Sequence, residues 1–296
     1  MRNKLPNFFV VGTGKAGTTS LYLTLKAHPQ IFMSPVKEPS FFASEIRIEN
    51  LSLEFKRHAM KQSSDLNRYL ISDWGDYVKL FGGADDEVAI GEATPSYLWS
   101  AAAAANIHAR FPQAKIVMIL RDPAERAYSH YLHLAAEGLT RCSLREHLTQ
   151  CERAEKGAIG IWHPFLEVGL YYEQVKRYLD LFPRGHVRVF WYEERWELAD
   201  LLRFLGVDSS WQPDSPARSL PRRTPRMVSV RYLLKRLDLL EPLRHIIPRR
   251  LRPLAFNASA PPPMAAQDRR WLVDYYRDDV RQLASLMDRD LATWLR

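Results

Sequence analysis

Residues 8–26 read FFVVGTGKAGTTSLYLTLK: an apolar run, a glycine-rich loop and a helix-forming segment. Short apolar runs are typical of buried strands. A helix that follows such a loop directs unpaired backbone N–H groups, and the positive end of its dipole, toward the loop. The order of strand, loop and helix therefore predicts a cradle for a phosphate or sulfate group.

The position of one lysine distinguishes this loop from the Walker A loop that binds nucleoside triphosphates. Gly12 and Gly17 are separated by four residues, as in Walker A, but the next position holds Thr18 where Walker A has lysine. The lysine is instead Lys15, inside the loop, from which its ammonium group can reach the bridging oxygen of a group in transfer. The loop residues predicted to contact the anion are Lys15, Ala16, Gly17, Thr18, Thr19 and Ser20.

A second apolar run ends in a further candidate anion site. KIVMIL, residues 115–120, is followed by RDPAERAYSHY. The guanidinium group of Arg121 presents a planar fork that suits phosphate oxygens, and Ser129 lies about two helical turns further on. The segment is also compatible with an ion pair between Arg121 and an acid of its own, Asp122 or Glu125.

Together these motifs resemble those of the sulfotransferases that use 3'-phosphoadenylyl sulfate (PAPS). GTGKAGTTSL is similar to their 5'-phosphosulfate loop, and RDPAERAYSHY is similar to their 3'-phosphate-binding motif. The resemblance implies that Arg121 and Ser129 clamp the 3'-phosphate, a group that ATP lacks. It therefore favours PAPS over a nucleoside triphosphate as cosubstrate, and a P-loop nucleotide or small-molecule kinase is the alternative.

Residues 28–42, HPQIFMSPVKEPSFF, resemble the HP…KEP-x-FF stretch of bacterial and heparan-type carbohydrate sulfotransferases. The resemblance implies that Glu38 is the catalytic base. Sulfuryl transfer needs a base for the acceptor proton and a cation for the departing phosphate, and Lys15 would supply the cation. The alternative role for Glu38 is an ion pair with Lys37 or Lys15. Neighbours on an extended chain point to opposite faces, so we do not expect Lys37 and Glu38 to pair.

The acceptor is not determined by these motifs. GEATPSY, residues 91–97, resembles the E-K-[ST]-P-x-Y segment of heparan-type relatives, but Ala93 replaces the lysine of their acceptor site. Ser40 likewise replaces a histidine that some relatives carry. Tyr97 and Trp99 either present an aromatic wall to the acceptor or pack in the core. We predict an acceptor hydroxyl on a small molecule, a lipid or a carbohydrate.

Positive charge is concentrated late in the chain. Residues 216–252 hold eleven lysines and arginines against two acids, whereas the whole chain has a net charge of only +8. Nucleic acid is not an expected partner, because neither aromatic interleaving nor a binding fold accompanies this charge. The segment is compatible with a basic amphipathic helix on an acidic membrane. SLPRRTPR, within it, resembles the loop that closes over nucleotide phosphates in heparan-type enzymes, which implies phosphate contacts from Arg222 and Arg223.

Four apolar runs of strand type alternate with helical segments. They lie at residues 7–11, 87–91, 115–120 and 187–191. This pattern predicts an α/β fold, a three-layer sandwich whose central sheet is largely parallel and whose strands are joined by helical crossovers. The cosubstrate should bind at the carboxyl ends of the strands. We expect one sulfotransferase domain over residues 1–296, with a C-terminal helix over residues 265–296 packed on it.

Composition narrows the remaining possibilities. The chain has no apolar stretch of about 18 residues and no room for a signal peptide before its first strand, so we expect a cytoplasmic enzyme. The two cysteines, Cys142 and Cys151, are expected to be reduced thiols, and a local disulfide is the alternative. No Cys/His cluster has metal-ligand spacing, and the family resemblance implies PAPS as cosubstrate without a metal.

Overall fold

The structure is a computed structural model that describes most of the chain. The described residues are 4–46, 70–153, 164–194, 197–213 and 262–296. The basic segment 216–252, with the predicted phosphate contacts Arg222 and Arg223, lies outside them.

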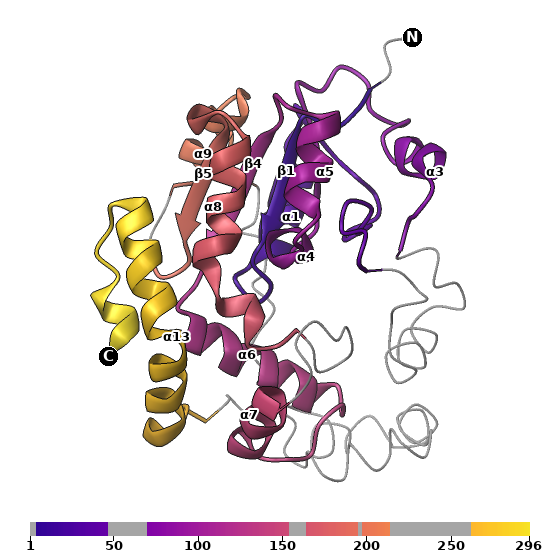
Figure 1. The fold of residues 1–296 in the computed structure, drawn as a ribbon. Helices are drawn as coiled ribbons and strands as arrows, with labels where there is room; N and C mark the ends of the chain where they lie inside the picture. Colours follow the sequence, from indigo (N-terminus) through magenta and orange to yellow (C-terminus); the bar gives the residue numbers. More distant parts are fainter. Residues whose placement is uncertain (1–3, 47–69, 154–163, 195–196, 214–261) are drawn as a thin grey trace, which may run out of the picture.

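Five strands form one sheet, and every neighbouring pair is parallel (Figure 1). In spatial order they are β2 (Ile31–Met33), β3 (Ala89–Ala93), β1 (Phe8–Gly12), β4 (Lys115–Leu120) and β5 (Val187–Trp191). β1 lies at the centre, and its five residues are all buried, as expected for a strand with helices on both sides. The predicted α/β fold with a parallel sheet is confirmed.

β1 is shifted by one residue, to Phe8–Gly12 from the expected 7–11, and two other strands differ more from the sequence-based expectation. The sequence pattern does not predict β2, because a strand of three residues is too short to show a period. This strand pairs with β3 at the edge of the sheet. β3 begins at Ala89 rather than at residue 87, after the N–H groups of Val88 and Ala89 have both donated to the Gln30 carbonyl. β3 also ends later than expected, at Ala93 instead of residue 91, which places Glu92 inside a buried strand.

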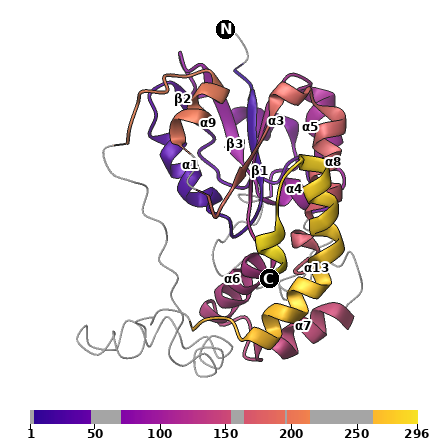
Figure 2. The ribbon, with the colours of Figure 1, turned by 90° about the vertical axis from the view of Figure 1, so that its left-hand side faces the viewer.

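Helices cover both faces of the sheet (Figure 2). The helices are α1 (Thr18–Lys26), α3 (Trp74–Lys79), α4 (Ser96–Trp99), α5 (Ala103–Arg110), α6 (Pro123–Ala136), α7 (Leu144–Arg153), α8 (Tyr171–Leu181), α9 (Leu198–Leu205) and α13 (Ala266–Met287), with short 3-10 turns η3 (Glu167–Gly169), η4 (Arg184–His186) and η5 (Ala292–Leu295). Alternate residues of β1 divide between two cores. Phe8 and Val10 pack with α1 and α9, and Phe9 and Val11 pack with α4, α5 and α8. This is the predicted three-layer sandwich.

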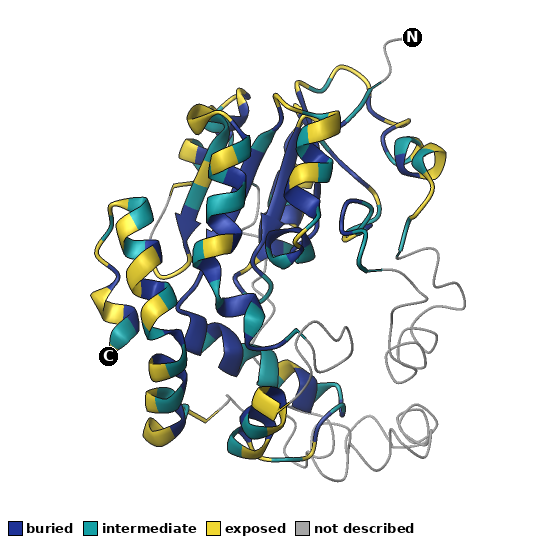
Figure 3. Ribbon diagram, in the orientation of Figure 1, coloured by how far each residue is buried: buried dark blue, intermediate teal, exposed yellow. Residues whose placement is uncertain are grey.

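Burial follows the layers. The central strands are buried, whereas the helices expose their outer sides to solvent (Figure 3). Gly91 of β3 lies under the ring of Phe8, and a Cβ atom added to Gly91 would be 2.5 Å from that ring. The absence of a side chain at this position therefore allows Phe8 to pack directly on β3.

The C-terminal helix is shorter than predicted. One helix is expected over residues 265–296, but α13 ends at Met287 because Asp288 takes a left-handed conformation, with φ of 47°. The chain then turns back, and η5 buries Trp294 against Trp191, with ring centroids 5.5 Å apart. α13 itself packs against α6 and α8 (Figures 1 and 2).

Asp279 of α13 caps the start of α8. Its carboxylate accepts hydrogen bonds from the backbone N–H groups of Tyr171 (2.7 Å) and Tyr172 (3.1 Å). N–H groups in the first turn of a helix have no acceptor within the helix, so this acid supplies what α8 itself lacks. Burial raises the pKa of the Asp279 carboxyl to about 6.

Two further observations concern the described residues. None of their helices combines the length and the apolar character needed to cross a lipid bilayer. Cys142 and Cys151 are both free thiols, as expected.

The contact between Gly91 and Phe8 can be tested by mutation. We expect Gly91→Ala to lower the free energy of unfolding by about 1–3 kcal/mol, because the added methyl group overlaps Phe8 in a packed core. Urea unfolding measures the change. Gly185→Ala is the matched control and should not be destabilised, since nothing lies within 4 Å of its added Cβ atom. A Gly91→Ala protein as stable as the wild type would contradict the close packing of Phe8 on β3.

Candidate functional site

The loop between β1 and α1 leaves the first turn of α1 open to a ligand. The N-cap residue Gly17 has φ of 87°, a left-handed conformation that favours glycine, and no side chain in the described part of the chain caps this helix end. The first hydrogen bond of the helix runs from Leu21 N–H to the Gly17 carbonyl. The N–H groups of Thr18, Thr19 and Ser20 therefore have no acceptor within the helix.

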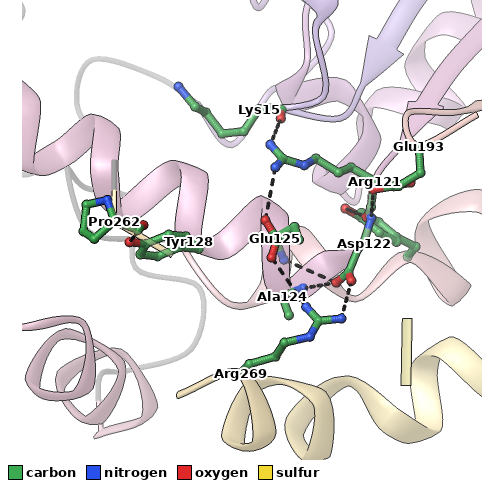
Figure 4. A network of polar contacts seen from close by, with 10 residues as sticks. Lys15, Arg121, Asp122, Ala124, Glu125, Tyr128, Glu193, Pro262 and Arg269 are labelled. Carbon is green, nitrogen blue, oxygen red and sulfur yellow. Dashed lines mark hydrogen bonds and ion pairs between the residues drawn. The ribbon is translucent and has the colours of Figure 1, made fainter. Parts of the chain in front are cut away.

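The two predicted anion-binding motifs meet at this loop. Nη1 of Arg121 donates a hydrogen bond of 2.9 Å to the carbonyl oxygen of Lys15 (Figure 4). The contact joins residues that are 106 positions apart in the sequence. Lys15 has φ of 72°, which is uncommon for a residue with a side chain. Its half-buried side chain leads away from Arg121 (Figure 4).

The electrostatics around Lys15 fit an anionic ligand. Burial, together with repulsion by Arg121 and Arg126, lowers the pKa of Lys15 from 10.5 to about 8. Attraction by Glu38 and Glu137 acts in the opposite direction and offsets only part of this effect. Cationic groups that repel one another are stabilised when an anion binds near them. A phosphate or sulfate group is such an anion.

Several elements hold Arg121 at the carboxyl end of β4. The residue is 3% exposed, and its carbonyl oxygen accepts a hydrogen bond of 2.9 Å from the Tyr171 hydroxyl. The next residue, Asp122, caps α6 by accepting a hydrogen bond of 2.9 Å from Ala124 N–H. The ion pair considered above as an alternative is also present, since Arg121 Nη2 lies 3.5 Å from Glu125 Oε2.

Ser129 lies on α6, as the motif predicts. Pro123 is the first residue of this helix, and Ser129 is half-buried further along it. Its position is therefore the expected one, whereas its contact with a 3'-phosphate stays a prediction.

Glu38 lies in the loop after β2, and one prediction about it is wrong. Its backbone N–H donates to the Ala93 carbonyl (3.1 Å), which ties the loop to the end of β3. The carboxylate pairs with Lys37, although an extended chain would separate the two side chains. The chain is not extended here, because Glu38 has φ of 64°. Among the described residues, four non-glycine residues have positive φ, and three of them, Lys15, Glu38 and Ser40, lie in the two predicted catalytic loops.

Tyr192 is a residue of the site that the sequence analysis does not identify. It follows β5, is 41% exposed, and lies under the guanidinium group of Arg121, which is 4.7 Å from its ring centroid. A Cβ atom added to Gly17 would be 3.5 Å from the same ring. Tyr192 thus lies beside both anion-binding motifs. The signal available in the sequence is an aromatic residue directly after a strand, at the edge where ligands bind.

Glu92 is a buried acid that the sequence analysis also leaves without a role. Its carboxylate accepts hydrogen bonds from the hydroxyl groups of Tyr77 (2.7 Å), Tyr97 (3.0 Å) and Thr94 (2.6 Å). The Tyr97 oxygen accepts in turn from Phe42 N–H (3.3 Å), so the cluster reaches the loop that follows Glu38. Burial raises the pKa of Glu92 from 4.5 to about 7, and the three hydroxyl groups oppose this rise.

The Glu92 cluster decides between the two interpretations of Tyr97. This residue is completely buried and bonded within the protein, so it belongs to the core and is not an aromatic wall for an acceptor. Trp99 is half-buried.

A cavity of about 430 Å³ is lined in part by the segment that follows Glu38 in the sequence. Its lining includes Ser40, Phe41, Ile46, Ile71, Asn106 and Arg110.

The remaining cofactor expectation concerns metals. Among the described residues, no group of three or more histidine, cysteine or acidic side chains is arranged to hold a metal ion. The expectation that the reaction needs no metal stays a prediction.

Comparison with known proteins gives a consistent result. Residues 6–177 match the model of the sulfotransferase family. The crystal structure of a sulfotransferase from Alicyclobacillus acidocaldarius superposes with a TM-score of 0.72, at 30% sequence identity and over 99% of both chains. The resemblance stated from the motifs is therefore confirmed.

Carbohydrate-directed relatives match a smaller part of the chain. Carbohydrate sulfotransferase 15 of Mus musculus is 28% identical over 49% of this chain and 30% of its own length. The bifunctional heparan sulfate N-deacetylase/N-sulfotransferase 3 of Homo sapiens is 28% identical over 61% of this chain and 19% of its own length. The matched stretch thus spans less than a third of either relative.

The buried Glu92 should make stability depend on pH. Because its pKa rises from 4.5 to about 7 on folding, the folded state binds more protons between these values, and the free energy of unfolding falls as the pH increases. Glu92→Gln removes this group. As the pH rises from 4.5 to 7.5, the wild type should lose up to about 3 kcal/mol of unfolding free energy that the Glu92→Gln protein does not lose.

Chemical denaturation at both ends of this pH range measures the effect. Glu197→Gln, which changes an exposed glutamate at the start of α9, is the matched control and should keep the pH dependence of the wild type. Parallel pH profiles for the wild type and Glu92→Gln would show that Glu92 does not titrate in this range.

Proposed function

The chain belongs to the sulfotransferase family, and from this premise we propose that it moves a sulfuryl group from PAPS to a hydroxyl group of an acceptor. The other product is adenosine 3',5'-bisphosphate (PAP). The observation that carries the proposal is the hydrogen bond from Arg121 to the Lys15 carbonyl. It joins the loop predicted to hold the 5'-phosphosulfate to the motif predicted to hold the 3'-phosphate, and a nucleotide with phosphates at both ends needs the two together.

The loop before α1 would hold the phosphosulfate. The open N–H groups and hydroxyl groups of residues 18–20 suit its oxygens, and the dipole of α1 favours negative charge at this end. Lys15 has two uses here. Its charge attracts the anion, and the anion in turn raises the lowered pKa of the ammonium group, so binding of PAPS favours the protonated form of Lys15.

The 3' side of the nucleotide would be held from β4, α6 and β5. Arg121 offers its guanidinium group to the 3'-phosphate, and Ser129 adds a hydroxyl donor. The exposed ring of Tyr192 lies next to both Arg121 and the loop, so it offers an aromatic face to the nucleoside between the two phosphates. Arg121 and Ser129 would distinguish PAPS from nucleotides without a 3'-phosphate, whereas Tyr192 would contact the nucleoside that all of them share.

The transfer itself exchanges one sulfur–oxygen bond for another. The acceptor oxygen attacks sulfur, the bond from sulfur to the bridging phosphate oxygen breaks, and the acceptor proton goes to the Glu38 carboxylate. Lys15 stabilises the charge that appears on the departing phosphate. The Glu38 carboxylate pairs with Lys37. Because the Glu38 side chain is about half exposed, an acceptor can still reach the carboxylate from solvent.

The acceptor is proposed only as a class, a hydroxyl group on a small molecule, a lipid or a carbohydrate. The cavity beside Ser40 supports a compact acceptor, because its volume of about 430 Å³ is that of a small-molecule site. Serine hydroxyls and aromatic rings both line it, so it suits a molecule with polar and apolar parts. The carbohydrates named for the relatives are not implied by this lining.

The proposed cosubstrate can be tested by calorimetric titration with PAP, ADP and AMP. We expect PAP to bind most tightly. Arg121→Ala should weaken PAP binding about 10- to 100-fold more than AMP binding, since a charged hydrogen bond to the 3'-phosphate contributes about 1.5–3 kcal/mol, whereas loss of the bond to the Lys15 carbonyl affects both ligands. Arg203→Ala is the matched control, because that exposed arginine pairs with Asp200 on α9, outside the site. Equal affinity of the wild type for PAP and ADP would contradict the proposal and favour the kinase alternative.

The proposed base can be tested by comparing neighbouring residues. Glu38→Gln keeps the size of the side chain but removes its basicity, so turnover should fall by about 10²–10⁴ while PAP affinity is retained. Lys37→Gln removes only the partner of the ion pair and should keep most of the turnover. Turnover is measured as acceptor-dependent PAP release, with an acceptor chosen from a panel of sugars, phenols and lipid alcohols. Normal turnover in Glu38→Gln would show that another group takes the proton.

A further inference from the structure

Glu125 lies between two guanidinium groups (Figure 4). Its Oε2 atom is 3.5 Å from Nη2 of Arg121, and its Oε1 atom is 3.6 Å from Nη1 of Arg269 on α13. Both distances exceed those of ordinary N–H···O hydrogen bonds, so the carboxylate is shared between the two cations. The Glu125 side chain is 36% exposed, which leaves it room to turn toward either one.

Arg269 is anchored by other groups than Glu125. Its Nη2 atom donates a hydrogen bond of 2.8 Å to Oδ2 of Asp122, whose side chain is only 6% exposed, and its Nε atom donates to the Arg296 carbonyl (2.8 Å). Asp122 is itself fixed, because its backbone N–H donates to the Glu193 carboxylate (2.9 Å) and its side chain caps α6. Arg269 is therefore a cation held in place beside the acid that pairs with Arg121.

We propose that Arg269 is a positioning residue for recognition of the 3'-phosphate: it draws the Glu125 carboxylate away from Arg121, so that Arg121 can bind the phosphate. This inference rests on the proposed function. It adds a residue of the C-terminal helix to a site whose two meeting motifs, around Lys15 and Arg121, lie within residues 6–177, the stretch matched by the family model.

The reason is competition between two anions for one guanidinium group. A phosphate monoester carries a charge of about −1.5 to −2 at neutral pH. At Arg121 it meets a carboxylate 3.5 Å from the same group. Without a second cation, Glu125 pairs with Arg121 and opposes the phosphate by like-charge repulsion. With Arg269 in place, the carboxylate closes the gap of 3.6 Å to Nη1 of Arg269 and keeps a partner when the phosphate arrives.

Calorimetric titration of full-length variants with PAP and AMP tests this role, because the two ligands differ only by the 3'-phosphate. Arg269→Ala should weaken PAP binding about tenfold and change AMP binding by less than about twofold. Arg277→Ala is the matched control. It removes an arginine of the same helix whose partner, Asp274, is on that helix too, and it should change neither affinity.

A double variant separates the charge effect from a structural one. Glu125→Gln in the Arg269→Ala background should restore most of the lost PAP affinity, because a neutral amide does not compete with phosphate. Loss of a merely structural anchor would not be restored by that change. If Arg269→Ala fails to fold, Arg269→Lys serves in the same comparison, since one ammonium group cannot span both Asp122 and Glu125.

The outcomes distinguish a failure of the proposed role of Arg269 from a failure of the proposed function. An unchanged ratio of PAP to AMP affinity in Arg269→Ala would overturn the role of Arg269, and so would a loss that Glu125→Gln does not restore. A wild-type protein that binds PAP no more tightly than AMP would overturn the proposed function of Arg121 instead.

Discussion

The hydrogen bond from Arg121 to the Lys15 carbonyl is the interaction on which the candidate site depends. It is possible because β1 and β4 are parallel neighbours, so their carboxyl ends, and the loops that follow them, lie side by side. Much of the surrounding structure fixes Arg121: the Tyr171 hydroxyl binds its carbonyl, and the Tyr192 ring lies under its guanidinium group. Burial, together with the same closeness of cations, lowers the pKa of Lys15, and an anion bound there relieves the repulsion.

The parts of the molecule that could be predicted from the sequence are those encoded locally. Apolar runs indicate β1 and β4, because a strand that is buried on both faces appears in the sequence as a nearly continuous run of apolar residues. Gly17 and the hydroxyl residues after it indicate an anion loop, because few other functions need that pattern before a helix. β2 could not be found in this way, since its pairing with β3, and not its own three residues, makes it a strand.

The acids of the site show why the remaining features could not be predicted. The pairing of Lys37 with Glu38 depends on the sign of one backbone angle, which alternation along an extended chain does not consider. The burial of Glu92 depends on hydroxyl groups from Tyr77 and Tyr97, which lie on other elements. A carboxylate in the core becomes tolerable only through such partners, and a sequence pattern does not contain them.

The docking of α13 has a consequence for biosynthesis. The glycine-rich loop before α1 is synthesised before Arg269, which binds Asp122, and before Asp279, which caps α8. Contacts between residues far apart in the chain form slowly, because a long loop must close before they can. A growing chain can therefore form β1, α1 and β4 while the surroundings of Arg121 are still incomplete. The candidate anion site reaches its native geometry only after α13 has been made and has packed on α6 and α8.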